Sequence, residues 1–194
     1  MLIAGDGLDT AEFMDLGATK TLTTAPVPGN LPVVMKGPVA NLVAGKVVAC
    51  GGAGVAGCYE YDFQVGDWAH LGDMPEVRSS SVDFVSNDGD TWYILGGRAD
   101  ATTPHTYHKT ALAYHNGEFK NAGSMPYPAY AGCAVRVNST HTLVAGGKNS
   151  ANSALKVAYL LEVATWEWTQ LDDMADGRYA KDLQMPYWFH SLDN

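Results

Sequence analysis

The chain has 194 residues, of which 46% are hydrophobic and 17% are charged, a composition typical of a globular domain with a buried core. Its formal net charge of -9 argues against nucleic acid or an anionic membrane surface as the main partner. No apolar run approaches the roughly 18 residues of a membrane-spanning helix, and the N-terminus lacks a signal-peptide pattern, so we expect a cytoplasmic protein that binds neither nucleic acid nor membrane.

The chain begins with "LIAGDG", a short apolar run ending in glycine, and this first unit, residues 1–37, is a weak copy of the later units. Residues 38–79 show the pattern clearly: "VVACGG" ends at Gly52, "YEYDF" surrounds Asp62, and Trp68 stands six residues before Met74. The first unit has Thr21 in place of the tryptophan. The order of these markers defines a repeating unit.

Two further units, residues 80–130 and 131–179, carry the same markers in the same order, at steps of 45 to 51 residues. The repeated positions are the glycine pairs Gly51–Gly52, Gly96–Gly97 and Gly146–Gly147, the aromatic residues Trp68, Phe119 and Trp168, and the arginines Arg78 and Arg178. A fixed period near 50 residues indicates a repeat architecture in which each unit packs on its neighbours.

Each unit is predicted to be β-structure. Segments such as "YILGG" and "VAYLLEV" are rich in β-branched and aromatic residues, and Gly, Pro, Asn or Asp interrupts the chain about every ten residues. Turn residues in "VSNDGD" and "VNSTHT" occupy the same place in successive units. We therefore expect an all-β protein with four locally connected, antiparallel strands per unit.

The glycines at 52, 54 and 57 match the G-x-G-x-x-G spacing of a dinucleotide-binding site. That site requires a helix to begin within the glycines, whereas "CYEYDF" comes next here and alternates like a strand. The sister stretches keep the glycine pair and lose the other glycines. We conclude that no cofactor site is encoded here, and no cofactor is expected.

These markers resemble the kelch repeat, a unit of about 50 residues that forms one four-stranded blade of a β-propeller. The resemblance covers about four repeats, the first degenerate, and implies a single propeller region over residues 1–194. It implies that the paired glycines lie where the blades crowd near the axis, and that the aromatic residues fill the wedge between blades. Arg78 and Arg178 recur at one position, which favours hydrogen bonding between blades.

The ends of the chain leave the closure of the propeller open. The chain begins in a second strand, and residues 180–194 contain a candidate first strand that would complete the first blade. There are three alternatives: a closed ring of four blades, an arc closed by a homo-oligomer or a partner chain, and a fragment of a larger propeller. An unclosed arc would expose sheet edges and apolar faces.

Candidate binding residues lie on the loops that share one face of such a propeller. Arg98 and Lys148 directly follow two glycine pairs, and His105 and His108 lie in the longest loop, "RADATTPHTYHK". The arginine suits a carboxylate or an acidic peptide because its guanidinium offers paired donors. His105 and His108 lack a third ligand at a defined spacing, so no metal site is expected.

The cysteines Cys50, Cys58 and Cys133 form neither a CxxC pair nor a disulfide framework. We expect them to be free, buried and in a reducing compartment. The sequence contains neither a Gly-x-Ser-x-Gly nucleophile elbow nor a Cys/His/Asn arrangement. The leading hypothesis is a protein-interaction module, a scaffold or adaptor, that binds a protein or peptide through this loop face. The alternative is a sugar-modifying enzyme, mutarotase-like or oxidase-like, on the same fold.

Overall fold

The computed structural model describes residues 2–4, 9, 11–16, 22–26, 28–100 and 104–179. Every regular element among them is a β-strand, and none is a helix. The all-β prediction with four-stranded antiparallel sheets is therefore confirmed. Within the same residues no helix is present that could cross a membrane.

Three sheets contain four strands each, joined mainly in chain order. The first sheet is β4 (Val39–Val43), β5 (Lys46–Cys50), β6 (Gly57–Asp62) and β7 (Asp67–Asp73). The second sheet is β8 (Val82–Val85), β9 (Trp92–Leu95), β12 (Thr110–His115) and β13 (Glu118–Ser124). The third sheet is β14 (Cys133–Arg136), β15 (His141–Ala145), β16 (Ala158–Glu162) and β17 (Glu167–Gln170).

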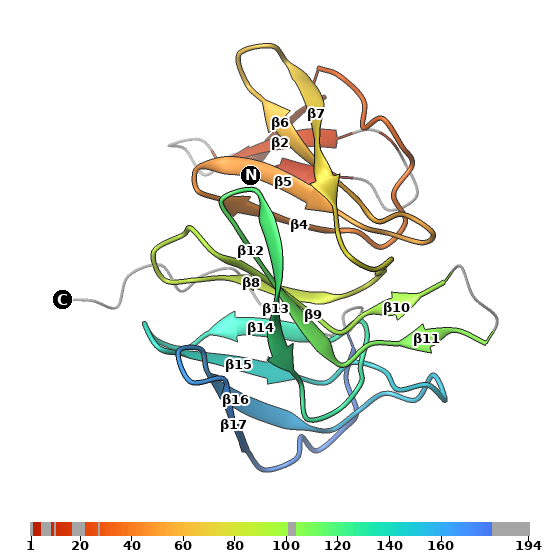
Figure 1. Cartoon of the computed structure of the whole chain (residues 1–194), viewed down its shortest axis with the longest axis vertical. Coiled ribbons are helices and arrows are strands. Elements are labelled where there is room, and N and C mark those ends of the chain that lie inside the picture. Colours follow the sequence, from red (N-terminus) through yellow and green to blue (C-terminus); the bar gives the residue numbers. More distant parts are fainter. Residues whose placement is uncertain are drawn as a thin grey trace.

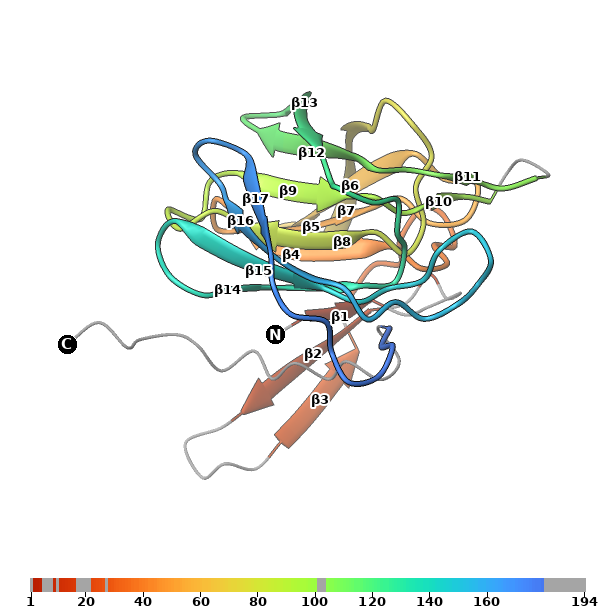
Figure 2. The same cartoon turned by 90° about the horizontal axis from the view of Figure 1, so that it is seen from below.

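Two smaller sheets complete the described structure. The N-terminal sheet has three antiparallel strands, β1 (Leu2–Ala4), β2 (Ala11–Leu16) and β3 (Leu22–Pro26). The strands β10 (Arg98–Ala99) and β11 (Thr106–Tyr107) form a hairpin within the segment expected to be the longest loop. This hairpin extends from the body of the molecule, and the N-terminal sheet projects from another side (Figures 1 and 2).

The first, second and third sheets follow one another from top to bottom of Figure 1. Their first strands lie together, because β8 contacts both β4 and β14. The second sheet thus presents one face to the first sheet and the other to the third. The described residues do not show a closed ring, and residues 180–194, which were expected to complete the first unit, lie outside them.

Apolar side chains fill the space between successive sheets. Val48 and Met74 of the first sheet region pack with Trp92 and Ile94 of the second, and Trp92 and Ile94 are fully buried. Between the second and third sheets, Phe84, Leu95 and Met125 pack with Val144 and Leu161. Full burial of such a side chain stabilises the fold by about 1.5–3 kcal/mol, so these two interfaces hold the sheets together.

The glycine pairs sit where the backbone turns against its own sheet. Gly96 has a φ of 61°, a backbone conformation that residues other than glycine rarely adopt. A Cβ at Gly96 would collide with the carbonyl oxygen of Ala129 and with the methyl group of Met125. The repeated glycine is therefore required by a close approach between the end of β9 and the segment that follows β13.

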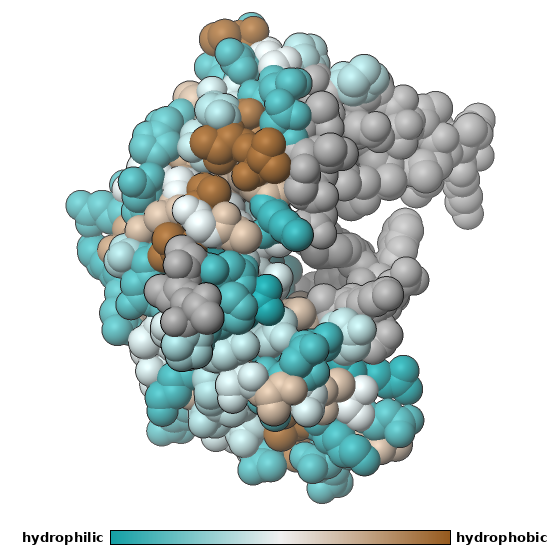
Figure 3. Space-filling view, turned by 90° about the vertical axis from the view of Figure 1, so that its right-hand side faces the viewer, coloured by the Kyte–Doolittle hydropathy of each residue, from teal (hydrophilic) through white to brown (hydrophobic). Residues whose placement is uncertain are grey.

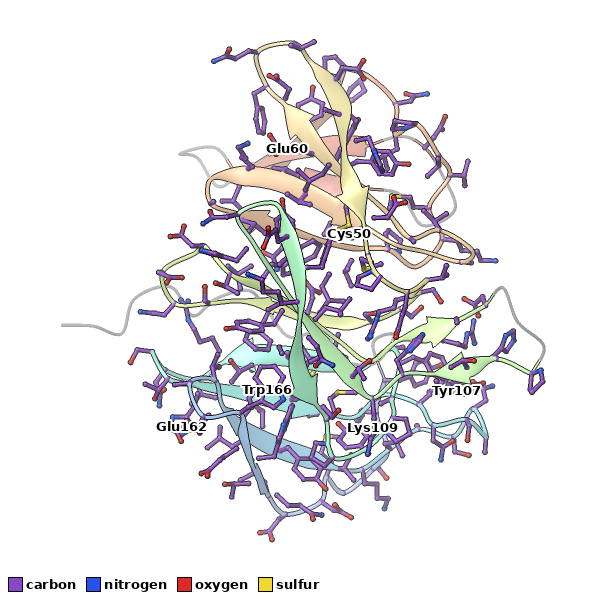
Figure 4. All side chains as sticks on the ribbon, viewed as in Figure 1. Cys50, Glu60, Tyr107, Lys109, Glu162 and Trp166 are labelled. Atoms are coloured by element: carbon purple, nitrogen blue, oxygen red, sulfur yellow. A yellow bond between two sulfur atoms is a disulfide. The ribbon has the colours of Figure 1, made fainter. Side chains whose placement is uncertain are left out.

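Two of the three cysteines are bonded, which corrects the sequence-based expectation. Cys50 at the end of β5 and Cys58 in β6 face each other in register and form a disulfide, with 4.1 Å between their Cα atoms. Both are completely buried, beside the contact with the second sheet (Figure 4). Cys133 is free. The disulfide removes the argument from cysteine content for a reducing compartment.

Candidate binding face

Arg78 is a buried cation that joins the first and second sheets. Its Nη1 donates to the carbonyl oxygens of Gly96 at 2.7 Å and Thr110 at 2.8 Å. Its Nη2 donates to Glu76 Oε2 at 3.0 Å and to the hydroxyl of Thr110. Burial lowers the pKa of Arg78, and Glu76 opposes that effect. Arg78 therefore binds the next sheet of its own chain and is not free to bind a partner.

The candidate residue His108 belongs to the same contact. Its Nδ1 lies 3.0 Å from Glu76 Oε2, and its Nε2 lies 3.2 Å from the carbonyl oxygen of Val77. The pKa of His108 is lowered, mainly by burial and then by the charge of Arg78. The charge of Glu76 opposes this shift only in part. Only 12% of its side chain is exposed. The structure thus places His108 between sheets, beneath the surface where we expected it.

Arg98 lies at the base of the β10–β11 hairpin, over an aromatic ring. Its guanidinium carbon is 4.9 Å from the centre of the Tyr130 ring, and its Nε contacts Asp100 Oδ1. Burial lowers the pKa of Arg98, but the hydrogen bond and charge of Asp100 outweigh it, so the pKa is raised. The Tyr107 ring is 5.6 Å from the Tyr130 ring. We name Arg98, Asp100, Tyr107 and Tyr130 the Arg98 cluster.

Lys148 is joined to this cluster through the backbone. Its N–H donates to the carbonyl oxygen of Tyr130 at 2.8 Å, and the N–H of Tyr130 returns a bond to the carbonyl oxygen of Lys148 at 3.2 Å. The Lys148 ammonium lies 3.9 Å from the centre of the Tyr179 ring. Arg98 and Lys148 thus come together, as two cation–aromatic pairs on adjacent segments.

The remaining predicted residue, His105, lies near the tip of the hairpin, 3.9 Å from Asp100 Oδ1 and 41% exposed. Tyr107 projects from β11 on the same hairpin (Figure 4). Among the described residues, no group of three or more His, Cys, Asp or Glu side chains is placed to hold a metal ion. The two histidines of the loop are therefore separated, one exposed and one between sheets.

The face that carries these loops is mainly hydrophilic, with an apolar patch over its upper part, where the first sheet lies (Figure 3). Within it, the Arg98 cluster combines a partly exposed cation with two tyrosine rings that are tilted relative to each other. Tyr130 is itself buried and its hydroxyl donates to Asn152 Oδ1 at 2.7 Å. The cluster is thus held by contacts from both the second and the third sheet regions. Tyr107 and Tyr130 were not identified from the sequence.

A groove of about 420 Å³ opens between the second and third sheets, at the opposite ends of β9 and β15 from Arg98 and Lys148. Its lining includes the stacked pair Phe84 and Tyr93, and the polar residues Arg136 and His141. The turns 86–91 and 137–140 border it. The sequence identifies these segments only as turns, because nothing local shows that two turns about 50 residues apart enclose a space.

Comparison with known proteins supports the fold and no particular activity. No protein-family model matches the chain, and no curated protein matches it. The chain is similar to a solved structure described as "Structure of YjhT", with a TM-score of 0.72 and 16% sequence identity. The match covers 88% of this chain and 62% of that one. The two proteins share an all-β arrangement, and this chain spans less than two thirds of the length of the other.

Proposed function

We propose that the chain is a kelch-type β-propeller region that acts as a protein-interaction module and binds a partner through the Arg98 cluster and Lys148. The repeated order of the sheets, the contact of their first strands and the likeness to YjhT support the propeller arrangement. The single observation that supports the binding role is the packing of Arg98 over Tyr130 beside Tyr107. Arginine and tyrosine are enriched among the residues that dominate the binding energy of protein interfaces.

The ligand that fits this chemistry is a peptide segment with a carboxylate and an apolar or aromatic side chain. The carboxylate would approach Lys148, whose ammonium lies over a ring, and Arg98, which is 29% exposed beside Asp100. The aromatic side chain would pack on Tyr107. The sugar-modifying alternative stays a prediction, because no specific observation in the described residues favours it.

The experiment is selection of peptides from a random displayed library on the wild-type chain, followed by affinity measurement against Arg98→Ala and Lys148→Ala. We expect selected peptides to lose at least tenfold in affinity with each variant. Arg136→Ala, at the opposite end of the sheets, is the matched control and should keep wild-type affinity. Peptides that bind the Arg98→Ala and Lys148→Ala variants as well as the wild type would refute this role of the face.

A further inference from the structure

We propose that the groove between the second and third sheets binds a small aromatic carboxylic acid, whose carboxylate pairs with Arg136 and whose ring packs against Tyr93. The groove lies at the opposite ends of β9 and β15 from Arg98 and Lys148, so this site goes beyond the proposed function. Its basis is a comparison among the four arginines of the chain, of which Arg136 alone lacks a carboxylate partner within the described residues.

The other three arginines each pair with a carboxylate two residues away in the sequence. These pairs are Arg78 with Glu76, Arg98 with Asp100, and Arg178 with Asp176. The residues two positions from Arg136 are Ala134 and Asn138, so the local sequence supplies no such partner there. Arg136 therefore departs from the pairing that its own chain uses for every other arginine.

The guanidinium of Arg136 lines the groove and is weakly bonded. Its Nη1 donates to the carbonyl oxygen of Ser86 at 3.3 Å, which is long for such a bond. A guanidinium has five N–H donors, and no further bond of this side chain is formed within the part of the chain that the structure describes. Because Arg136 is half-buried, a carboxylate that entered the groove would meet a partly desolvated cation with paired donors.

Asp88, the carboxylate in the groove lining, is engaged in its own turn. Its Oδ1 accepts hydrogen bonds from the hydroxyl of Ser86 and from the N–H of Asp90 at 3.1 Å. These two bonds, the one from Ser86 first, lower the pKa of Asp88. Asp88 thus stabilises the 86–91 turn, and the charge of Arg136 remains available to a ligand.

An aromatic wall stands in the same groove. The rings of Phe84 and Tyr93 are stacked, with centroids 4.9 Å apart and an interplanar angle of 23°. Phe84 is buried and Tyr93 is half-buried, so Tyr93 is the ring that a ligand can reach. The indole of Trp166, labelled in Figure 4, lies 5.6 Å from the Tyr93 ring. Such a wall favours a flat ring, which packs on it in an offset or edge-to-face arrangement.

The size and charge of the groove narrow the class of ligand. Its volume of about 420 Å³ lies within the range of small-molecule sites, about 300–1,000 Å³. At neutral pH its charged side chains are Arg136 and Asp88, with His141 as a further titratable group. One arginine beside one carboxylate, in a chain of net charge -9, favours the single charge of a carboxylate over the double charge of a phosphate monoester.

The experiment is isothermal titration calorimetry of the whole chain with naphthoate and with its neutral amide, which keeps the rings and removes the charge. We expect saturable binding of naphthoate and at least tenfold weaker binding of the amide. Arg136→Ala should weaken naphthoate at least tenfold and leave the amide unchanged. Tyr93→Leu should weaken both probes, because both lose the ring on which they pack.

Two further variants serve as the charge control and the safeguard. Lys120→Ala removes a cation whose side chain is 76% exposed on β13, and it should bind naphthoate like the wild type. Ser139→Asp adds a negative charge at an exposed position of the groove lining and should weaken naphthoate but not the amide. Circular dichroism establishes folding, and Ser139→Asp keeps the test decisive if Arg136→Ala does not fold.

Three results would overturn the proposal: no saturable binding of naphthoate up to its solubility limit, equal affinity for naphthoate and the amide, or unchanged naphthoate affinity in both Arg136→Ala and Ser139→Asp. Arg98→Ala locates the site and should keep naphthoate affinity. A loss in Arg98→Ala with none in Arg136→Ala would assign the acid to the Arg98 cluster and overturn the groove site. Peptide affinity, measured on Arg98→Ala and Lys148→Ala, reports the proposed function separately.

Discussion

Arg78 shows how one side chain can connect two sheets. Its guanidinium donates hydrogen bonds to two carbonyl oxygens, a hydroxyl and a carboxylate. Arg78→Ala would leave those acceptors without their donor, and each buried group left unpaired costs about 1–3 kcal/mol. We expect the variant to lose about 3–4 kcal/mol of unfolding free energy, measured by urea denaturation.

The control for Arg78→Ala is Lys120→Ala, which removes a cation whose side chain is 76% exposed. Exposed ion pairs contribute about 0–1 kcal/mol, so this variant should unfold close to the wild type. Equal stability of the two variants would show that Arg78 does not join the sheets.

Asp83 is a desolvated carboxyl at the contact of the first and second sheets. It accepts hydrogen bonds from Asn41 Nδ2 at 3.0 Å and Trp92 Nε1 at 2.8 Å. Desolvation raises the pKa of Asp83. The two hydrogen bonds act in the opposite direction but are smaller in effect, so the pKa in the folded protein is above its usual value. The folded state therefore holds its proton to a higher pH than the unfolded state does.

That difference predicts a pH dependence. With the pKa of Asp83 raised by folding, stability is lost as the pH rises from the unfolded pKa, near 4, through the folded pKa. Asp83→Asn keeps an acceptor oxygen and has no charge to bury, so its stability relative to the wild type should increase over that interval. Denaturation curves at a series of pH values from about 4 upward measure this; a difference that is constant with pH would contradict it.

At the scale of the strand, two bulges offer a matched pair of glycines. Gly72 in β7 and Gly123 in β13 have nearly the same φ, 138° and 136°. A Cβ at Gly72 would meet open space, whereas a Cβ at Gly123 would collide with the indole of Trp166, which lies beside the third sheet (Figure 4).

Gly123→Ala should therefore be more destabilising than Gly72→Ala, by about 1–3 kcal/mol, the usual cost of overpacking. The backbone strain is common to both variants and cancels in the comparison. Thermal or chemical unfolding of the two proteins gives the difference, and identical losses would mean that Trp166 does not pack tightly on the second sheet.

The disulfide is a property of the β5–β6 pair. It closes a loop with a sequence separation of 8 residues, for which the chain-entropy model gives about 2.5 kcal/mol. The double variant Cys50→Ala, Cys58→Ala should lose roughly that amount, and a reductant should lower the unfolding free energy of the wild type but leave that of the variant unchanged. Two free thiols at these positions in the oxidised wild type, by mass after alkylation, would contradict the pairing.

Much of each element could be predicted from the sequence because its signals are local. The glycine pairs end β5, β9 and β15, and the repeated aromatic residues Trp68, Phe119 and Trp168 fall in the last strand of each sheet. The disulfide was missed because the cysteines face each other only through the register of β5 on β6. Register depends on the turn between the strands, which the sequence leaves open.

The sequence by itself determined the repeat, the strands and their antiparallel order, because alternation, turn residues and period act over a few residues or recur at fixed spacing. Only the tertiary structure decided what each repeated residue does. Arg78 and Arg178 are identical in the sequence, yet one is buried by the next sheet and the other is exposed. Likewise His108 and Arg98 meet Glu76 and Tyr130 through contacts between distant segments. Such partners depend on how sheets pack, and packing brings together residues that no local pattern relates.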